Sequence, residues 1–521
     1  MMTYRGVVVA RNGAVATSQP LATSAGLHVL QQGGNFVEAA IAVSSVLTVV
    51  EPWNSHLGGD TFVVLYDART RRTHALNASG PAPRAATLER FRNGIPLRGM
   101  ASALVPGLVS AWALLHERYA TRELAELLQP AIRYAQQGFP AGYRYSQVFH
   151  AHADLLKQFP VTWRELMPDG ELPYPGKMIT QPQLGWSLSR IAAAGPMDFY
   201  RGEIAERIVR HCQHRGGLFT EADLANPPAE WLEPLRVDYR GYTLYAQPPV
   251  SQGHILAQMM NLLEGYSLRA MGALSADVIH LQVEAKKLAF ADRMAYLGDP
   301  RFVSVPMDAL LSKSYAERRR QQVNLHRAAE HVTAGEVEHD TTYFCVVDRY
   351  GNAISFIQSI FHSFGCAEVA EGTGILFNNR MTGFSLDTSS PNVLQPGKRT
   401  AHTLNAWLVT KADELAFVGG TPGGDVQVQS NTQTLCNLLD FEMNPQEAVE
   451  APRWQHDVDG LKIERRVPAD TVRALEHKGH SVQLLPDLGQ SGAVQVIAVH
   501  PDSKALLAGS DPRCDGHAAG W

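Results

Sequence analysis

The spacing of hydrophobic and polar positions changes several times along the chain, and each change predicts a different element. Apolar residues recur at three- and four-residue steps in several segments, which is typical of helices packed on one face. The segment 37–50 is apolar almost throughout, which indicates burial on several sides. Residues 61–66 have an alternating pattern with β-branched and aromatic side chains, which predicts a strand. Helices are predicted at 21–32, 37–50, 106–137 and from 278 to about 297.

A polar stretch at 325–340 separates this first part from a second part with a different pattern. The stretch has little apolar periodicity, and we expect an exposed tail there. Two strands at 341–348 and 353–358, joined by the turn Arg349-Tyr350-Gly351-Asn352, predict a hairpin. Further strands are predicted near 403–409, 415–418, 494–499 and 505–507, with helices at 425–439 and 469–478. Helices on both sides of a block of antiparallel strands predict an α+β layered fold.

Composition narrows the class of protein. The chain has 521 residues and a formal charge of −5, with 46 basic and 51 acidic residues. Nucleic-acid binding requires clustered positive charge, and this composition does not indicate it. No run of about 18 apolar residues predicts a membrane span. Five scattered cysteines without a C-x-x-C pair favour a reducing compartment. The apolar run after the first residues is too short for a signal segment, and we expect a cytoplasmic protein.

Thr341 stands where the polar stretch meets a buried strand. An enzyme with an N-terminal nucleophile needs such a junction, because backbone cleavage before the threonine frees an α-amine that then accepts the proton of the hydroxyl. A free α-amine titrates at about 7.7–8.0, close to working pH. A threonine pair at the start of a strand is, by itself, more often a simple strand signal.

A glycine-rich loop supplies a second feature. Gly419-Gly420-Thr421-Pro422-Gly423-Gly424-Asp425 lies between a predicted strand and a predicted helix. Adjacent glycines let backbone N–H groups converge on an anion at a helix N-terminus. Such donors hold the oxyanion of a tetrahedral intermediate, although flexible strand-to-helix turns have the same composition.

Ordered motifs over nearly the whole chain resemble the γ-glutamyltransferase family. They are Pro20-Leu21-Ala22-Thr23-Ser24-Ala25-Gly26, Gln32-Gly33-Gly34-Asn35, Glu51-Pro52 with Gly58-Gly59, Pro248-Pro249, Ala291-Asp292-Arg293, Gly298-Asp299-Pro300, Thr341-Thr342-Tyr343-Phe344-Cys345, Gly374-Ile375-Leu376-Phe377-Asn378-Asn379, Thr421-Pro422-Gly423-Gly424, Ala451-Pro452-Arg453 and Ser510-Asp511-Pro512-Arg513.

The resemblance implies a four-layer αββα sandwich built by both halves of a chain that cleaves itself between Asp340 and Thr341. Residues 1–340 would form a large subunit, whose tail is 325–340, and residues 341–521 a small one. The two would remain together as a heterodimer, and a dimer of such heterodimers stays open. Thr341 would be the nucleophile, Ser359 its orienting hydroxyl, and Gly423 and Gly424 the oxyanion hole.

The substrate pocket departs from the family pattern. The family's carboxylate-binding arginine aligns with Asn77, and a serine pair that helps it aligns with His402-Thr403. Its three ammonium-binding residues align with Phe361, Arg380 and Gly383. An α-ammonium beside Arg380 would be repelled, whereas a carboxylate would gain a two-pronged hydrogen-bond pair. We therefore expect a small carboxylated amide without an α-amine.

Within the family, this profile resembles amidohydrolases that convert oxamate to oxalate and ammonia in purine catabolism. A glutaryl-type acylase and a γ-glutamyl hydrolase or transpeptidase are alternatives, and an uncleaved binding protein is a remote one. The residues that we expect to contact the substrate are Arg380, His402, Thr403, Phe361 and Asn77, although His402 is equally well explained as part of a polar wall. No metal or organic cofactor is expected for catalysis, and the spacing of His326, His331 and His339 is not that of a metal site.

Overall fold

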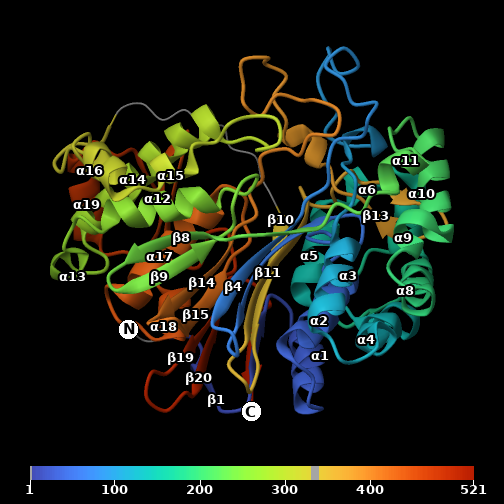
Figure 1. Cartoon of the computed structure of the whole chain (residues 1–521), viewed down its shortest axis with the longest axis horizontal. Coiled ribbons are helices and arrows are strands. Elements are labelled where there is room, and N and C mark those ends of the chain that lie inside the picture. The colour runs from blue at the N-terminus through green and yellow to red at the C-terminus, as the bar shows by residue number, and fades with distance from the viewer. Residues whose placement is uncertain (1–2, 330–339) are drawn as a thin grey trace.

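Two seven-stranded antiparallel sheets lie face to face at the centre of the molecule (Figure 1). The computed structural model describes residues 3–329 and 340–521. Sheet A has the order β1 (Val8–Ala10), β20 (Leu506–Ser510), β19 (Gln495–Val499), β15 (Glu414–Gly420), β14 (Ala406–Lys411), β9 (Tyr242–Ala246), β8 (Leu235–Tyr239). Sheet B has the order β21 (His517–Gly520), β2 (Ala14–Thr17), β10 (Asp340–Val347), β11 (Ala353–Phe361), β3 (Asp60–Asp67), β4 (Arg72–Ala78), β7 (Glu230–Leu232).

Alternation along the strands sends side chains to two different cores. On β10, Tyr343 and Cys345 point between the sheets, whereas Phe344 and Val346 point away from sheet A. The core between the sheets is completed from sheet A by residues such as Leu408, Val418 and Ile497. A period of two is what a strand buried on both faces requires.

Helices cover the outer face of each sheet. Sheet B is covered by α1 (Pro20–Gln31), α2 (Phe36–Val50) and α3 (Leu108–Tyr119), and sheet A by α12 (Gly253–Leu263), α17 (Val426–Leu439) and α18 (Pro445–Glu450). Further out, α4 (Leu124–Gln137) packs against α2, α8 (Pro182–Ala194) against α4, and α14 (Ala276–Tyr296) against α12. Every residue of α2 is buried, as its apolar run predicts. The four layers are therefore α, β, β and α, and the predicted αββα sandwich is confirmed.

The remaining helices and strands are mostly short. They are α5 (Tyr143–Ala151), α6 (Ala153–Lys157), α7 (Pro160–Leu166), α9 (Asp198–Arg201), α10 (Glu203–His214), α11 (Glu221–Leu224), α13 (Leu268–Met271), α15 (Met307–Leu310), α16 (Lys313–Arg320), α19 (Ala469–His477), the 3₁₀ turns η1 (Met100–Ser102) and η2 (Arg380–Gly383), and the short strands β5 (Phe139–Pro140), β6 (Met178–Ile179), β12 (Val369–Ala370), β13 (Ile375–Leu376), β16 (Trp454–Asp457), β17 (Gly460–Glu464) and β18 (Val482–Leu485). None of the helices in the described ranges is long and apolar enough to cross a membrane.

Both halves of the chain contribute strands to both sheets. In sheet B, β10 from the second half pairs with β2 from the first half, and β11 pairs with β3. In sheet A, β14 pairs with β9 and β20 pairs with β1. Residues 1–340 and 341–521 therefore share their cores and do not form separate folding units.

The structure corrects two predicted elements, and it describes only part of a third. The helix predicted over 106–137 is two helices, α3 and α4, because the backbone turns at Thr121 and Arg122, where both N–H groups donate to the Glu38 carboxylate. The strand predicted from 403 begins only at Ala406. Of the tail predicted over 325–340, residues 330–339 lie outside the described residues. Residues 324–327 are exposed, and Ala328 is buried.

Candidate active site

The predicted nucleophile and its predicted orienting hydroxyl lie next to each other. Thr341 is the second residue of β10 and is 3% exposed. Its Oγ1 donates a hydrogen bond of 3.2 Å to Ser359 Oγ on the neighbouring strand β11. Ser359 Oγ also accepts the backbone N–H of Phe361 at 2.8 Å. The β10–β11 register shifts between Asp340 and Thr342, and this irregularity lies where the two hydroxyls meet.

A buried carboxyl group supports the strand just after Thr341. Glu51 Oε2 accepts hydrogen bonds from Thr342 Oγ1 at 2.8 Å and from Ser18 Oγ at 2.7 Å. Burial raises the pKa of Glu51, and the two hydroxyls oppose that shift. Because α2 ends just before Glu51 and β2 just before Ser18, this network ties β10 to both of those elements.

The glycine-rich loop begins where β15 crosses the nucleophile strand. At Gly420, the last residue of β15, a Cβ atom would lie only 2.4 Å from the Tyr343 ring, so a side chain there would collide with β10. Gly423 and Gly424 follow with φ values of 118° and 54°, in the region that favours glycine. Helix α17 then begins at Val426. Adjacent N–H groups before a helix N-terminus suit a developing negative charge.

The side chain of Arg380 is a buried cation that contacts one aromatic ring and one carboxylate. Its side chain is 1% exposed, and none of its three guanidinium nitrogens has a hydrogen-bond partner within the described part of the chain. The guanidinium carbon lies 4.0 Å from the centre of the Phe361 ring, and Nε lies 3.4 Å from Asp60 Oδ2. Burial lowers the pKa of Arg380 to about 10, and Asp60 opposes that shift, so the group stays charged at neutral pH.

Asp60 links Arg380 to His402. His402 Nε2 lies 3.2 Å from Asp60 Oδ2, and the His402 ring packs edge-on against Phe62 at 4.7 Å between ring centres. Burial lowers the pKa of His402 to about 4, with Arg380 as the second cause, so the imidazole is neutral at neutral pH. A neutral histidine leaves Asp60 as the one charge opposite Arg380 in this trio.

Thr403, which follows His402 in the chain, is linked to the glycine loop through Gln252. Its Oγ1 is buried and has no hydrogen-bond partner among the described residues. Its carbonyl oxygen accepts Gln252 Nε2 at 2.7 Å, and the same nitrogen donates to the Gly424 carbonyl at 3.1 Å. Contacts therefore run from Thr341 through Ser359 and Phe361 to Arg380, and separately from Thr403 to the loop.

Asn77 is the predicted site residue least connected to the others. It lies on β4, and its Oδ1 accepts the backbone N–H and the hydroxyl of Ser79, which closes a local turn. Its role in substrate binding stays a prediction.

Sequence reasoning did not identify Asp60 or Gln252 as site residues. Asp60 follows Gly58-Gly59 and directly precedes the predicted strand 61–66, and an acidic residue next to a largely apolar strand was the available signal. Gln252 carried no comparable signal, because its contacts with Thr403 and Gly424 join residues more than 150 positions apart.

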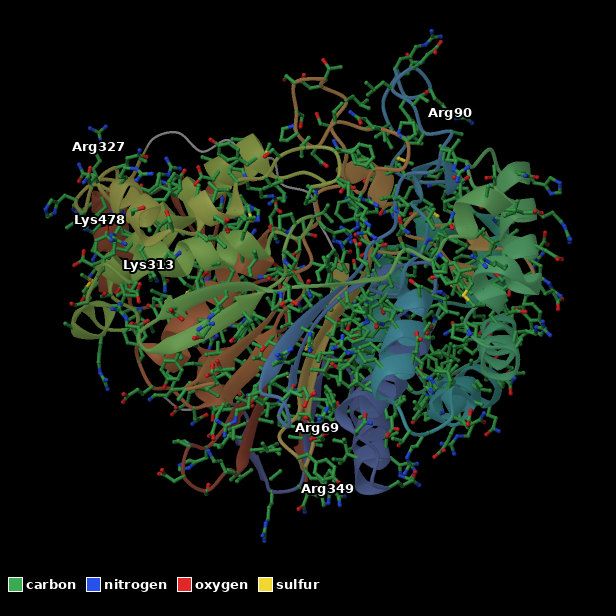
Figure 2. All side chains as sticks on the ribbon, in the orientation of Figure 1. Arg69, Arg90, Lys313, Arg327, Arg349 and Lys478 are labelled. Atoms are coloured by element: carbon green, nitrogen blue, oxygen red, sulfur yellow. The ribbon has the colours of Figure 1, made fainter. Side chains whose placement is uncertain are left out.

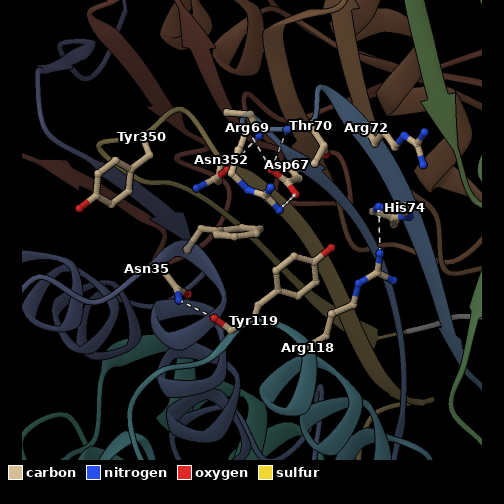
Figure 3. Close-up of a pocket in the computed structure, with 12 residues that line it drawn as sticks. Asn35, Asp67, Arg69, Thr70, Arg72, His74, Arg118, Tyr119, Tyr350 and Asn352 are labelled. Atoms are coloured by element: carbon tan, nitrogen blue, oxygen red, sulfur yellow. Dashed lines mark hydrogen bonds and ion pairs between the residues drawn. The ribbon is translucent and has the colours of Figure 1, made fainter.

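A separate cleft lies at the other end of sheet B. Figure 3 shows it between the β3–β4 turn at Asp67 to Arg72 and the β10–β11 turn at Tyr350 and Asn352. Its volume is about 740 Å³, and none of the predicted site residues lines it. Arg118 Nη2 donates to His74 Nε2 at 3.1 Å across one wall. The cleft is distinct from the Thr341 site, since that site lies at the opposite end of β10.

Comparison with known proteins agrees with this geometry. The profile of the Gamma-glutamyltranspeptidase family matches residues 22–521. The chain is 38% identical to the "Glutathione hydrolase-like YwrD proenzyme" of Bacillus subtilis (strain 168), over 98% of this chain and 99% of that protein. It is 35% identical to the "Acylase ACY 1 proenzyme" of Pseudomonas sp. (strain V22), over 97% of this chain and 92% of that protein.

Among solved structures, a cephalosporin acylase from Bacillus halodurans superposes with a TM-score of 0.95 at 38% identity, covering 100% of this chain and 98% of that one. The likeness in sequence and in structure extends over both halves of the chain. The protein described here belongs to the gamma-glutamyltranspeptidase family and has the fold of a self-processing hydrolase with an N-terminal nucleophile.

Proposed function

We propose that the chain cleaves itself before Thr341 and then hydrolyses a small carboxylated amide that has no α-amine, with oxamate as the substrate. The contact between Thr341 and Ser359 supports the chemistry. The observation that carries the substrate class is the buried guanidinium of Arg380, whose nitrogens lack hydrogen-bond partners in the described structure.

Self-cleavage would begin with attack of Thr341 Oγ1 on the carbonyl carbon of residue 340. The peptide C–N bond breaks, the hydroxyl proton passes to the nitrogen of Thr341, and an ester replaces the amide. Water then hydrolyses the ester and leaves a free α-amine on Thr341. The two chains, 1–340 and 341–521, stay together as a heterodimer because they share both sheets.

Hydrolysis of the substrate would use the same hydroxyl, now with the α-amine of Thr341 as its base. Ser359 holds the hydroxyl in place through the 3.2 Å contact. The N–H groups of Gly423 and Gly424 face the oxyanion of the tetrahedral intermediate. The α-amine of Thr341, protonated by the hydroxyl, gives its proton to the leaving ammonia. Water then releases oxalate from the threonine ester.

Arg380 would bind the free carboxylate of the substrate. A buried guanidinium without hydrogen bonds is costly unless a ligand supplies acceptors, and a carboxylate supplies two of them in the matching geometry. The hydroxyl of Thr403 adds a further donor that is unpaired in the described structure. Phe361 covers one face of the guanidinium and reduces the space beside it, which favours a short acyl group.

An acylase of glutaryl type is the second candidate, supported by relatives that bear the names "Acylase ACY 1 proenzyme" and cephalosporin acylase. Both candidates require a carboxylate without an α-amine, so the length of the acyl group separates them. A γ-glutamyl hydrolase or transpeptidase would require an ammonium to be bound near Arg380, where the like charges repel each other.

The test is a series of dicarboxylic monoamides of increasing length, from oxamate through succinamate to glutaramate, with a γ-glutamyl chromogenic amide beside them. Ammonia release is measured for the monoamides. We expect kcat/KM to be highest for oxamate. A maximum at glutaramate would replace oxamate with a glutaryl substrate, and strong activity only on the γ-glutamyl amide would reject the role of Arg380.

A denaturing gel and N-terminal sequencing test the self-cleavage. We expect two bands, the smaller of which begins with Thr341. One full-length band after long incubation would reject the nucleophile and support an uncleaved binding protein.

A further inference from the structure

Three potential metal ligands meet in the outer helical layer that covers sheet A. His280 and Glu284 lie one turn apart on α14, and His480 lies in the loop between α19 and β18. Their ligand atoms all lie within 4.8 Å of one another, and the three residues are 0%, 3% and 6% exposed. Lys478 and Arg327, labelled in Figure 2, mark this edge of the molecule, far from Arg69 and Arg349 at the turns of sheet B.

The hydrogen bonds of the two histidines fix which nitrogens face each other. His280 Nε2 lies 2.7 Å from the carbonyl oxygen of Asn324, which can only accept, so this nitrogen carries a hydrogen. His280 Nδ1 therefore carries a lone pair, which accepts a hydrogen bond from His480 Nε2 at 2.8 Å. A backbone carbonyl that holds the second nitrogen of an imidazole is the usual support of a metal-binding histidine.

We propose that His280, Glu284 and His480 bind one zinc ion. Two imidazoles and one carboxylate, with a water molecule as fourth ligand, form a common tetrahedral set for this metal. At zinc–nitrogen distances of about 2.0–2.1 Å, tetrahedral ligands lie roughly 3.3 Å apart. The two ring nitrogens need to separate only by about half an ångström to reach that spacing. The hydrogen on His480 Nε2 moves to Nδ1, so the ion enters without net proton release.

Lys287 sets the strength of this site. Its Nζ lies 2.7 Å from Glu284 Oε1 and 2.9 Å from the carbonyl oxygen of Ala329. The ammonium competes with a cation for the carboxylate, so zinc must displace it from Glu284 while it keeps the Ala329 carbonyl. This competition predicts moderate affinity and makes Lys287 a diagnostic position.

The site also lies where the end of the first half of the chain is attached to the second half. Ala328 N donates to the Lys478 carbonyl at 2.7 Å, and Lys478 Nζ donates to the Leu325 carbonyl at 2.6 Å. Asn324, which holds His280, begins this segment. A zinc ion would therefore join α14, from residues 1–340, to the loop at His480, from residues 341–521.

Zinc binding is measured directly on the full chain, purified without a histidine tag, by calorimetry and by metal analysis after dialysis against Zn²⁺. We expect about one bound ion per chain, and no binding of Mg²⁺, which prefers oxygen ligands. Cobalt in place of zinc should give the visible absorption of a tetrahedral site. Absence of zinc uptake by the wild-type chain would overturn the proposal.

Variants then assign the site. His480→Ala should weaken zinc binding at least about tenfold, whereas His480→Cys should keep it because a thiolate is also a zinc ligand. Lys287→Met should bind zinc more tightly than the wild type. The exposed His500→Ala is the matched control and should change nothing. Equal binding by His480→Ala and the wild type would place the ion elsewhere. Because binding is read without turnover, the result does not depend on the proposed substrate.

Discussion

Two buried arginines in this protein have opposite surroundings. The side chains of Arg380 and Arg513 are both 1% exposed. Arg513 donates to Glu464, to Asp511 and to the carbonyl oxygens of Val449 and Ala451. Among the described residues, the guanidinium of Arg380 has no hydrogen-bond partner and approaches one carboxylate and one ring.

Their pKa values shift in opposite directions. Burial lowers the pKa of both groups, but Asp511 and Glu464 reverse the effect and raise that of Arg513 above its ordinary value. At Arg380 burial prevails, and the pKa falls to about 10. Arg513 therefore stabilises the folded chain through partners within the chain. Arg380 is instead held in place by the fold, and it gains hydrogen bonds only when a ligand supplies acceptors.

The largest expected effect is the loss of turnover at Thr341 while binding at Arg380 remains. Thr341→Ala should remain uncleaved and should release no ammonia, because the hydroxyl is the proposed nucleophile for both reactions. Oxamate should still stabilise this variant, by about 2.7 kcal/mol at a hundredfold excess over its Kd, as measured by thermal unfolding. Cleavage or turnover without the hydroxyl would contradict the mechanism.

Loss of the satisfied arginine should destabilise the protein strongly. Arg513→Met removes the main partner of buried Glu464 and one of the two arginine partners of Asp511, which costs about 3–5 kcal/mol. Denaturant unfolding of Thr341→Ala, used as the uncleaved background, measures the change with and without the second substitution. A change below about 1 kcal/mol would mean that the network around Arg513 contributes little net stability.

Loss of the unsatisfied arginine should instead reduce binding. Arg380→Met should lower kcat/KM for carboxylated amides by an amount equivalent to about 2–5 kcal/mol, the range for a lost buried charge pair. It should lower the free energy of unfolding less than Arg513→Met does. If the two variants lose equal stability and Arg380→Met keeps its activity, the contrast between the two arginines fails.

Counted per pH unit, the smallest effect concerns His402, which lies beside Asp60. Because burial lowers the pKa of His402 to about 4, the folded state disfavours its protonation. Its contribution to stability is complete above about pH 6.5, the unfolded value, and is lost as the pH falls toward 4, by about 1.4 kcal/mol per unit. His402→Gln should reduce this slope in unfolding measurements, whereas the exposed His500→Gln should leave it unchanged.

Local patterns were sufficient to predict most elements of the fold. The hairpin of β10 and β11, the buried helix α2 and the glycine loop follow from spacing and turn residues in adjacent positions, and their bounds agree closely. The break between α3 and α4 could not be predicted, since it depends on the Glu38 carboxylate some 80 residues away in the chain.

The candidate site depends more on the family resemblance than on local patterns. The resemblance placed Ser359 beside Thr341, and the structure has their hydroxyl oxygens 3.2 Å apart on the neighbouring strands of a hairpin. Asp60 was missed because its partners, Arg380 and His402, come from distant segments that only the folded sheets bring to it. A sequence pattern indicates which residue types are present, but the pairing of buried charges depends on tertiary contacts.

The strand order of sheet B also determines when the sheet can be completed during synthesis of the chain. β2, near the start of the chain, lies between β10 and β21, so Ala14–Thr17 pair on one side with residues 517–520. Translation must reach the last of these residues before the sheet around Thr341 acquires its edge strand. Any chemistry that requires the finished sheet can therefore begin only once the ribosome has synthesised the chain as far as residue 520.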